Sequence, residues 1–273
     1  MTPASQPAQY DLQLDRQEAK YIIPPALVPD IREFIRPFCE PDPHSNGEPP
    51  AYTVVTLQLD TPDLALHYAK ENEALNRFKL RVRTYGEPGT NAVFMEIKRK
   101  IRGTVVKSRT MVAFEEWNER LLFDPVVRLR FRSSKEEHGF LEFRRLVQET
   151  GARPVVLVRY ERESYFGRID HYARVSFDRR LAYQPTRSWD SWGRGGRWFP
   201  MDSSVALHKQ QPFSGLVLEL KTLNEVPHWM VDLVVTFALE RTGNCKYSNA
   251  LWLESLFCGA PAIPDFVAAQ LAW

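Results

Sequence analysis

The segment RFKLRVRTYG, Arg77–Gly86, decides the fold because charged and apolar residues alternate along it. In a β-strand, residues two apart in sequence point to the same face. Lys79, Arg81 and Arg83 therefore share one face of the predicted strand Phe78–Tyr85, and the apolar residues between them share the other. The segment predicts a strand that packs one face on a hydrophobic core and presents a basic face on the opposite side.

The same alternation recurs in other predicted strands. The charged residues that share a face are Glu96, Lys98 and Lys100 in Ala92–Lys100, Lys107 and Arg109 in Thr104–Ala113, Arg174 and Asp178, with Ser176 between them, in Ala173–Asp178, and Glu219 and Lys221 in Gly215–Lys221. The alternative explanation is a sheet with one solvated face, but such a face normally mixes charged residues with Thr, Ser and Gln. Adjacent like charges repel, and a polyanion offsets that cost, so we expect a phosphate-rich ligand.

The order of predicted elements indicates an α+β protein, because short turns join most of the strands and the helices stand apart from them. The remaining elements are strands at Tyr10–Lys20, Tyr52–Leu59 and Pro154–Tyr165, and helices at Ala26–Arg36, Glu115–Phe123, Glu136–Thr150, Pro227–Arg241 and Tyr247–Phe257. With helices over the apolar faces, the charged faces converge inward, as in an antiparallel barrel with a polar, cationic interior. Such a tunnel would exclude a nucleic-acid duplex but admit a chain of phosphates. Glu219 and Glu96 could hold a divalent cation there.

We expect a single domain over residues 9–260, with tails at residues 1–8 and 261–273. A chain of 273 residues is long enough for one large core, and no internal repeat or linker divides it. Gln184–Gln211, which contains SWDSWGRGGRWFPMD, is predicted to be a long loop whose tryptophans pack on the domain. The alternative for this loop is a nucleic-acid contact through stacking.

The formal net charge is only +2, from 36 Lys and Arg against 34 Asp and Glu, and gives no general argument for binding nucleic acid or membranes. Three widely spaced cysteines without a CxxC pair argue against a zinc knuckle or a disulfide scaffold and fit a reducing cytosol. The polar N-terminus does not resemble a signal peptide, and no run of about 18 apolar residues predicts a transmembrane helix. We therefore expect a cytoplasmic protein, for which any membrane partner is a separate chain.

Segments along most of the chain resemble the VTC domain, the polyphosphate polymerase branch of the triphosphate tunnel metalloenzymes. The matching segments, in the family's order, are RQEAKY (Arg16–Tyr21), VVTLQLDT (Val54–Thr61), RFKLRVRTYG (Arg77–Gly86), FMEIKRK (Phe94–Lys100), VVKSR (Val105–Arg109), RYERESY (Arg159–Tyr165), RVSFDRRL (Arg174–Leu181), LELKT (Leu218–Thr222), PHWM (Pro227–Met230) and CKYS (Cys245–Ser248). Each segment is weak on its own, and together they are specific for this branch.

The resemblance implies an antiparallel tunnel barrel of about eight strands that holds phosphates in its interior. The residues implied as catalytic and phosphate-binding are Lys20, Arg81, Arg83, Lys98, Lys107, Arg162 and Arg174. Further substrate-binding candidates are Lys79, Arg109 and Lys221, which strand alternation adds, and Lys246 and Ser248, which lie in the CKYS segment. Glu219 is implied to bind Mn²⁺ or Mg²⁺, and Glu96 is a second metal candidate. Arg159 is also assigned to the cations that face the interior, although it alternates with Arg162 along its strand.

The reaction implied is transfer of the terminal phosphoryl group of ATP to a growing polyphosphate or pyrophosphate chain, with release of ADP and no nucleic-acid partner. The alternatives are a tunnel-type triphosphatase, in which Glu96 or Glu18 orients water, and a non-catalytic polyphosphate-binding module. Two positions depart from the family. Arg16 replaces the first glutamate of an ExExK register that continues with Glu18 and Lys20, and Cys245 stands where the family commonly has Ser.

Overall fold

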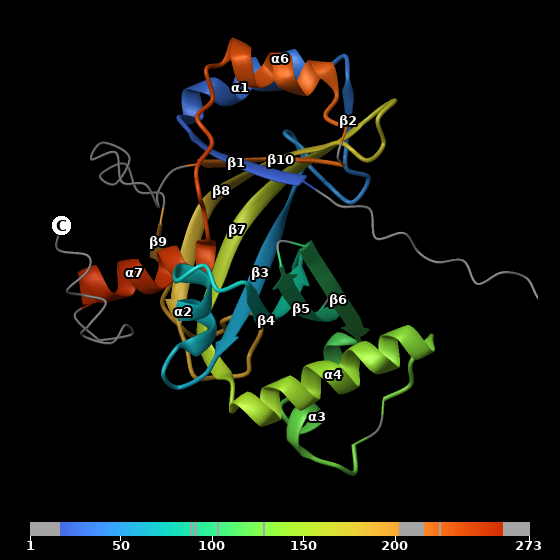
Figure 1. Ribbon diagram of the computed structural model, residues 1–273, viewed down its shortest axis with the longest axis vertical. Helices are drawn as coiled ribbons and strands as arrows, with labels where there is room; N and C mark the ends of the chain where they lie inside the picture. Colours follow the sequence, from blue (N-terminus) through green and yellow to red (C-terminus); the bar gives the residue numbers. More distant parts are fainter. Residues whose placement is uncertain are drawn as a thin grey trace, which may run out of the picture.

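The computed structural model describes residues 17–258 apart from 88, 90, 91, 103, 128, 202–215 and 224, and apart from the side chains of 255–258. Its main feature is an antiparallel sheet that curls into a half-barrel (Figure 1). Neighbours along this sheet are, in spatial order, β1 (Gln17–Ile23), β10 (Leu216–Thr222), β8 (Arg174–Pro185), β7 (Arg153–Gly167), β3 (Ala51–Asp60), β4 (Asn76–Tyr85), β5 (Val93–Ile101) and β6 (Thr104–Val112). The short strands β2 (Cys39–Pro41) and β9 (Phe199–Pro200) pair with β7 and β8.

The predicted α+β class and the antiparallel sheet of eight main strands are confirmed. The sheet is a half-barrel with β1 and β6 as its two edges, and all neighbouring main strands are antiparallel. The predicted tails, residues 1–8 and 261–273, lie outside the described residues.

Helices cover the convex face of the sheet and one end of its concave face (Figure 1). The helices are α1 (Val28–Ile35), α2 (Ala65–Glu71), α3 (Arg120–Phe123), α4 (Ser134–Thr150), α6 (His228–Thr236) and α7 (Lys246–Cys258), with 3₁₀ turns at Pro25–Leu27 and Phe114–Glu116. On the convex face, α1 and α6 pack over β1, β10 and β8, and α3 and α4 pack over β5 and β6. By contrast, α7 packs on the concave face, with α2 beside it. Within the described ranges, none of the helices combines the length and the apolar character needed to cross a bilayer.

Alternation along the strands builds the main core. On β4 and β5, Leu80, Val82, Met95 and Ile97 are each at most 1% exposed and belong to one hydrophobic cluster with Phe143 of α4. Full burial of one such side chain contributes about 1.5–3 kcal/mol. The convex layer therefore fixes which residues of each strand point outward, and the charged residues between them are left to face the concave side.

Helix capping, one hydrogen bond and one glycine place α4 over β6. The Ser133 hydroxyl accepts the Glu136 N–H at 3.2 Å and begins the helix, and Gly151, with φ 66°, ends it. The Thr110 hydroxyl of β6 donates to the Glu136 carbonyl at 3.0 Å. A Cβ at Gly139 would lie 2.7 Å from Thr110 Oγ1, so glycine lets the helix approach the strand closely.

Two predicted helices are wrong in their extent. The helix predicted over Glu115–Phe123 is split into a 3₁₀ turn and α3, because the Asn118 side chain accepts the Arg120 N–H at 3.0 Å and starts a new turn. The helix predicted to run to Arg241 ends at Thr236, and Ala238 then takes the left-handed φ of 46°.

The strands differ from prediction mainly at their ends. β8 runs to Pro185, well beyond the predicted end at Asp178, and its pairing with β7 shifts register between Arg159 and Glu161. This irregularity interrupts the simple alternation that sequence reasoning uses. The short elements α2 and β2 were not predicted, and β1 continues to Ile23.

The tryptophan-rich part of Gln184–Gln211 packs on the domain, as predicted. Trp192 is 6% exposed within the main core, and Trp189 and Trp198 pack against the same cluster. The Trp117 indole N–H also donates to the Trp189 carbonyl at 3.1 Å. Residues 202–211 lie outside the described residues.

Phe143→Ala should destabilise the protein by about 3–5 kcal/mol, because it removes a fully buried ring and leaves a cavity between α4 and the sheet. Chemical denaturation would measure this loss of unfolding free energy. The slope of that free energy against denaturant concentration should stay unchanged. Leu141→Ala is the matched control, since Leu141 lies on the same helix but is 52% exposed. Equal effects of the two substitutions would contradict the proposed packing of α4.

Candidate functional site

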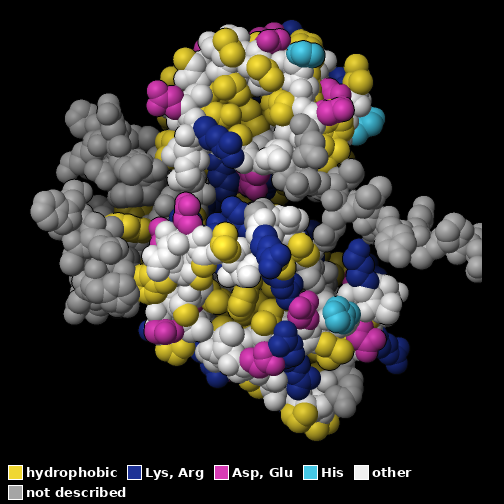
Figure 2. Space-filling model, in the orientation of Figure 1, with side chains coloured by type: hydrophobic (Ala, Val, Ile, Leu, Met, Phe, Trp, Pro, Cys, Tyr) yellow, Lys and Arg dark blue, Asp and Glu magenta, His cyan; other side chains and the backbone are white. Residues whose placement is uncertain are grey.

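The strand register brings the predicted cationic residues onto the concave face of the half-barrel. Arg81 pairs with Glu96, which pairs with Arg109, across β4, β5 and β6. Lys98 lies between Lys79 and Lys107 in the same way. Figure 2 shows Lys and Arg side chains gathered in a hollow between the part that carries α1 and α6 and the part that carries α2 and β4–β6. We call this surface the concave face.

One wall of the concave face is organised around Glu96, whose side chain is fully buried. Four cations surround its carboxylate: Arg81 Nε at 2.5 Å, Lys107 Nζ at 2.9 Å, Arg109 Nε at 3.4 Å and Arg83 Nη1 at 3.8 Å. Burial alone would raise the pKa of Glu96, but the charges of Arg81, Arg83 and Lys107 outweigh it and hold that pKa well below its usual range. These five residues, the Glu96 cluster, form a net positive group around a permanently ionised carboxylate.

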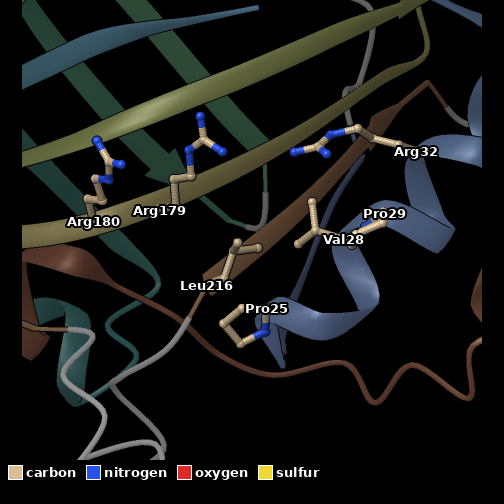
Figure 3. A pocket seen from close by; sticks show the side chains of 7 residues that line it. All are labelled: Pro25, Val28, Pro29, Arg32, Arg179, Arg180 and Leu216. Atoms are coloured by element: carbon tan, nitrogen blue, oxygen red, sulfur yellow. The ribbon is translucent and has the colours of Figure 1, made fainter. Parts of the chain in front are cut away.

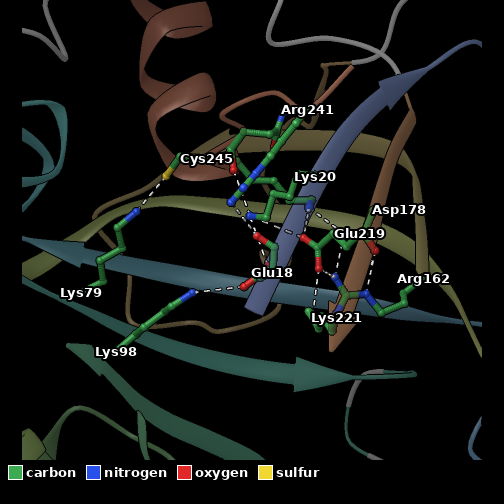
Figure 4. A network of polar contacts seen from close by, with 12 residues as sticks. Glu18, Lys20, Lys79, Lys98, Arg162, Asp178, Glu219, Lys221, Arg241 and Cys245 are labelled. Atoms are coloured by element: carbon green, nitrogen blue, oxygen red, sulfur yellow. Dashed lines mark hydrogen bonds and ion pairs between the residues drawn. The ribbon is translucent and has the colours of Figure 1, made fainter. Parts of the chain in front are cut away.

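The opposite wall is organised around Glu219 of β10, whose side chain is 5% exposed (Figure 4). Its carboxylate lies 3.0 Å from Lys221 Nζ, 3.1 Å from Arg162 Nη2, 3.3 Å from Lys246 Nζ and 3.6 Å from Lys20 Nζ. Burial opposes ionisation, but the charges of Lys246, Lys221 and Arg162 lower the pKa of Glu219 well below its ordinary value.

Asp178 of β8 completes this Glu219 cluster, which comprises Glu219, Asp178, Lys20, Arg162, Lys221 and Lys246. The fully buried Asp178 carboxylate accepts two hydrogen bonds from the Arg162 guanidinium, both at 2.7 Å, and lies 2.6 Å from Lys246 Nζ. This paired geometry holds the planar guanidinium in one orientation. Arg162 is thereby positioned between two carboxylates and aimed at the concave face.

Helix α7 delivers Lys246 to the site and is tied to the sheet beside it. The Tyr247 hydroxyl donates to Asp60 Oδ2 at 2.7 Å. The same Asp60 carboxylate accepts the Leu66 and His67 N–H groups at 2.9 Å each, which begins α2. Asp60 therefore caps α2 and anchors α7.

The two walls meet across the hollow through side chains from distant strands. Lys98 Nζ of β5 lies 3.5 Å from Glu18 of β1, and Lys79 Nζ of β4 lies 2.9 Å from the Cys245 sulfur before α7 (Figure 4). At this place lies a pocket of about 500 Å³, the opening pocket, lined by Glu18, Lys20, Lys70, Arg241, Thr242, Gly243, Asn244 and Cys245. Glu18 and Lys20, which line this pocket, also take part in the ion pairs of the concave face.

The other predicted residues take less central places. Arg174 is exposed at the start of β8, with its guanidinium 4.4 Å from the Phe166 ring. Arg109, which belongs to the Glu96 cluster, also lies over the Phe94 ring, 3.7 Å from its centre. Ser248 is buried, with its hydroxyl 3.3 Å from His67 Nδ1, so the structure does not bring it to either cluster. Its role in substrate binding stays a prediction.

Arg159 does not belong to the cations that face the interior. Its guanidinium lies 4.3 Å from the Trp198 ring, which packs against the convex core. A pocket of about 320 Å³ on the convex side, between α1 and β8, is also lined by arginines (Figure 3). Arg32 and Arg179 there pair with Glu163, and Arg180 pairs with Glu161. Carboxylates thus neutralise these arginines outside the concave face.

The donor set fits a divalent cation that takes most of its ligands from phosphate and water. Among the residues that the structure describes, no group of three His, Cys, Asp or Glu side chains is placed to cage an ion. Mg²⁺ and Mn²⁺ are commonly held by one or two carboxylates together with substrate phosphates. Glu219 and the partly exposed Glu18, each paired with Lys20, offer such carboxylates, and neighbouring lysines lower the pKa of Glu18 to about 2. Glu96 is enclosed by four cations, as Glu219 is, and its role as a second metal ligand stays a prediction.

The match to a family model agrees with this geometry. The model described as VTC domain matches residues 15–253. The chain belongs to the VTC domain family. The resemblance that the sequence motifs carry is therefore confirmed at the level of the family.

No curated protein matches this VTC domain. Among solved structures, the PH1819 protein of Pyrococcus horikoshii OT3 aligns at 14% identity and a TM-score of 0.44, over 88% of this chain and 99% of that chain. A candidate adenylate cyclase from Vibrio parahaemolyticus aligns at 10% identity and a TM-score of 0.45, over 86% and 97% of the two chains. Similarities this distant carry no argument about function.

Sequence reasoning did not predict the contacts through which Asp178 and Glu18 organise the VTC domain site. Asp178 shares its strand face with Arg174 and Ser176, and this alternation was the available signal. Its role is visible only once β7 places Arg162 beside it. Glu18 alternates with Lys20 on β1, but its contact with Lys98 depends on the curl of the whole sheet.

Phosphate affinity should fall as the pH rises through about 8, because Lys107 loses its proton there. Burial, helped by the charges of Arg81 and Arg83, lowers the pKa of Lys107 to about 8, although Glu96 opposes the shift. The ammonium form, which binds anions, is complete below that pKa and lost above it. Tripolyphosphate titrations by calorimetry at about pH 6.5 to 9.5 would show the loss.

Lys107→Arg should flatten this profile, because arginine stays protonated throughout the range. Lys135→Arg, on the exposed surface of α4, is the control and should keep the wild-type profile. The control also corrects for the ionisation of the ligand itself. Identical profiles for the wild-type protein and Lys107→Arg would contradict the assignment of Lys107.

Proposed function

We propose that this VTC domain is a metal-dependent polyphosphate polymerase, which transfers the terminal phosphoryl group of ATP to the end of a polyphosphate or pyrophosphate chain and releases ADP. The observation that carries the proposal is the pair of clusters around Glu96 and Glu219. They line one concave face with more cations than carboxylates. Membership of the VTC domain family supports the same substrate class.

The two walls give the protein a way to hold donor and acceptor phosphates close together. Arg81, Arg83, Lys107 and Arg109 offer one set of positive charges, and Arg162, Lys20, Lys221 and Lys246 offer the other. Arginine suits bidentate phosphate contacts, and lysine supplies a point charge. Phosphoryl transfer depends mainly on positioning and on neutralising charge, which is what such an arrangement supplies.

The reaction requires no side-chain base in this scheme. The attacking phosphate oxygen at the end of the acceptor chain is already ionised near neutral pH, so the cationic walls need only overcome the repulsion between two anions. A bound Mg²⁺ or Mn²⁺ would neutralise charge on the phosphate oxygens. Glu219, with Glu18 on the neighbouring strand β1, would hold that ion, while Glu96 keeps four cations of the other wall in place.

Hydrolysis of triphosphates is the second candidate, and Glu18 is the observation that favours it. Its carboxylate is about one-third exposed, lines the opening pocket and stays ionised, so it could orient an attacking water. One assay separates the two reactions. Purified protein is incubated with ATP, Mn²⁺ and a pyrophosphate primer, and the products are resolved on a gel. A polyphosphate ladder with ADP supports polymerisation, whereas free phosphate without a ladder supports hydrolysis.

Arg83→Ala should lower polyphosphate affinity and turnover by about tenfold to a hundredfold, as expected for a charge-assisted hydrogen bond worth about 1.5–3 kcal/mol. The Arg83 side chain is only 11% exposed and reaches both Thr56 and Glu96 on the concave face. Arg145→Ala is the control, because Arg145 is 55% exposed on α4 and pairs only with Glu149 among the described contacts. If both variants behave like the wild-type protein, the concave face is not the phosphate site.

Glu219→Gln should abolish metal-dependent turnover but keep polyphosphate binding, because it removes a carboxylate and leaves the surrounding cations. The side chain keeps its shape, and the loss of a negative charge among four cations does not weaken anion binding. Turnover, tripolyphosphate affinity and melting temperature are measured together. Glu149→Gln on the surface of α4 serves as the control. Unchanged turnover in Glu219→Gln would reject Glu219 as the metal ligand.

A further inference from the structure

Cys245 lies where the opening pocket meets the concave face. Its sulfur is 2.9 Å from Lys79 Nζ, which reaches it from β4 on the far side of the hollow (Figure 4). The Cys245 carbonyl accepts the Asn249 N–H at 2.9 Å, so the residue stands at the beginning of α7. A thiolate at this place is stabilised by a lysine and by the N–H groups of the first helical turn.

The opening pocket has polar groups that no part of the described chain satisfies. Asn244, beside Cys245, is 7% exposed, and neither its side-chain oxygen nor its side-chain nitrogen has a hydrogen-bond partner. Buried amides nearly always find partners, so these two groups indicate a ligand that offers both a donor and an acceptor, as an amide does. The same pocket is lined by three basic side chains, Lys20, Lys70 and Arg241, and by one acidic side chain, Glu18, so its lining carries a surplus of positive charge. A volume of about 500 Å³ suits a small organic molecule.

The thiol is chemically suited to react. Burial alone would raise the pKa of Cys245, but the Lys79 charge and hydrogen bonds with Lys79 and Ser248 outweigh it and lower that pKa to about 6. The thiol is then mostly ionised near neutral pH. Cys39 is the opposite case within the same chain: it is 3% exposed in the convex core, and burial raises its pKa to about 12.

We propose that Cys245 is a covalent modification site that forms a mixed disulfide with a small anionic disulfide bound in the opening pocket. The Cys245 sulfur attacks one sulfur of the bound disulfide. A new S–S bond forms as the original S–S bond breaks, and the other half leaves as a thiolate carrying the electron pair. Cys245 is oxidised and the disulfide is reduced, so no further oxidant is needed. Lys20, Lys70 and Arg241 face the carboxylates of the reagent, and Asn244 pairs with its amide.

Modification would change the concave face directly. The adduct occupies the opening pocket, which Lys20 and Glu18 line. It also removes the negative charge of the sulfur from beside Lys79, so that the Lys79 ammonium loses this partner. This inference does not depend on which phosphoryl-transfer reaction the VTC domain catalyses, because its test reads the adduct itself.

The probes are glutathione disulfide, which is anionic and carries amides, and cystamine, which is a cationic disulfide. The full chain is treated with each at about pH 7, and mass spectrometry of its peptides locates the adduct. We expect glutathionylation at Cys245, none in Cys245→Ser, and wild-type labelling in Cys39→Ser. The measured quantity is the ratio of labelling by glutathione disulfide to labelling by cystamine. The protein unfolded in urea has no charged pocket to select between the reagents, and this ratio should be about tenfold or more higher in the folded protein.

Two further measurements test the role of Lys79. Lys79→Met should slow labelling at pH 7 by about tenfold or more, because the thiol returns towards its ordinary pKa of about 8.5. Independently of any variant, the alkylation of wild-type Cys245 by iodoacetamide should rise with pH around a midpoint near 6. Labelling confined to Cys39 or Cys258, an alkylation midpoint near 8.5, or equal charge preference in folded and unfolded protein would each overturn the proposal.

Discussion

The burial of two carboxylates among cations is the constraint on which the concave face depends. Without Glu96, the charges of Arg81, Arg83, Lys107 and Arg109 would face one another across three strands at short range. Taking an ion out of water is costly, and removing one partner of a buried pair is more costly still. The carboxylates therefore have to stay ionised, and the lowered pKa values of Glu96 and Glu219 show that the cations keep them so. Each cluster is left with a surplus of positive charge.

Helix α7 connects this electrostatic arrangement to the packing of the domain. Its apolar residues Leu251 and Leu253 fill one end of the concave face, in a cluster with Val54 and Val158. Its first residue, Lys246, is placed in the Glu219 cluster, and Tyr247 is tied to Asp60. The apolar part thus leaves only the remainder of the concave face for a charged ligand. A change in the position of α7 would alter both the shape of the hollow and its charge.

Strand alternation predicted the fold class and most of the inward residues, because one physical rule decides both. The apolar layer of Leu80, Val82 and Met95 requires Arg81 and Arg83 to face the other way, and the sequence shows this directly. Alternation failed where the backbone is irregular. The extra residue lies in β8, where Arg180 has a φ of 52° and both Arg179 and Arg180 pair with carboxylates of β7. β7 itself stays regular at this place, so alternation puts Arg159 and Arg162 on opposite faces, as the contact of Arg159 with Trp198 shows.

Contacts that depend on the curl of the sheet could not be predicted at all. Lys98 and Glu18 are far apart in sequence and in strand order, as are Lys79 and Cys245, and no local pattern pairs them. The partners of Asp178 could not be predicted either, because they come from β7 and α7. The sequence shows which side chains share a face. The distances between the two walls are set only by the curl of the assembled half-barrel.

The Glu96 cluster also bears on how the chain avoids misfolding. If β5 slipped by one residue against β4 and β6, its side chains would exchange faces. The Glu96 carboxylate would enter the apolar layer beside Leu80 and Phe143, and Met95 would sit among arginines. Both displacements are strongly unfavourable, so a slipped pairing is penalised twice. The charges that form the ligand surface therefore also select the correct strand register while the sheet assembles.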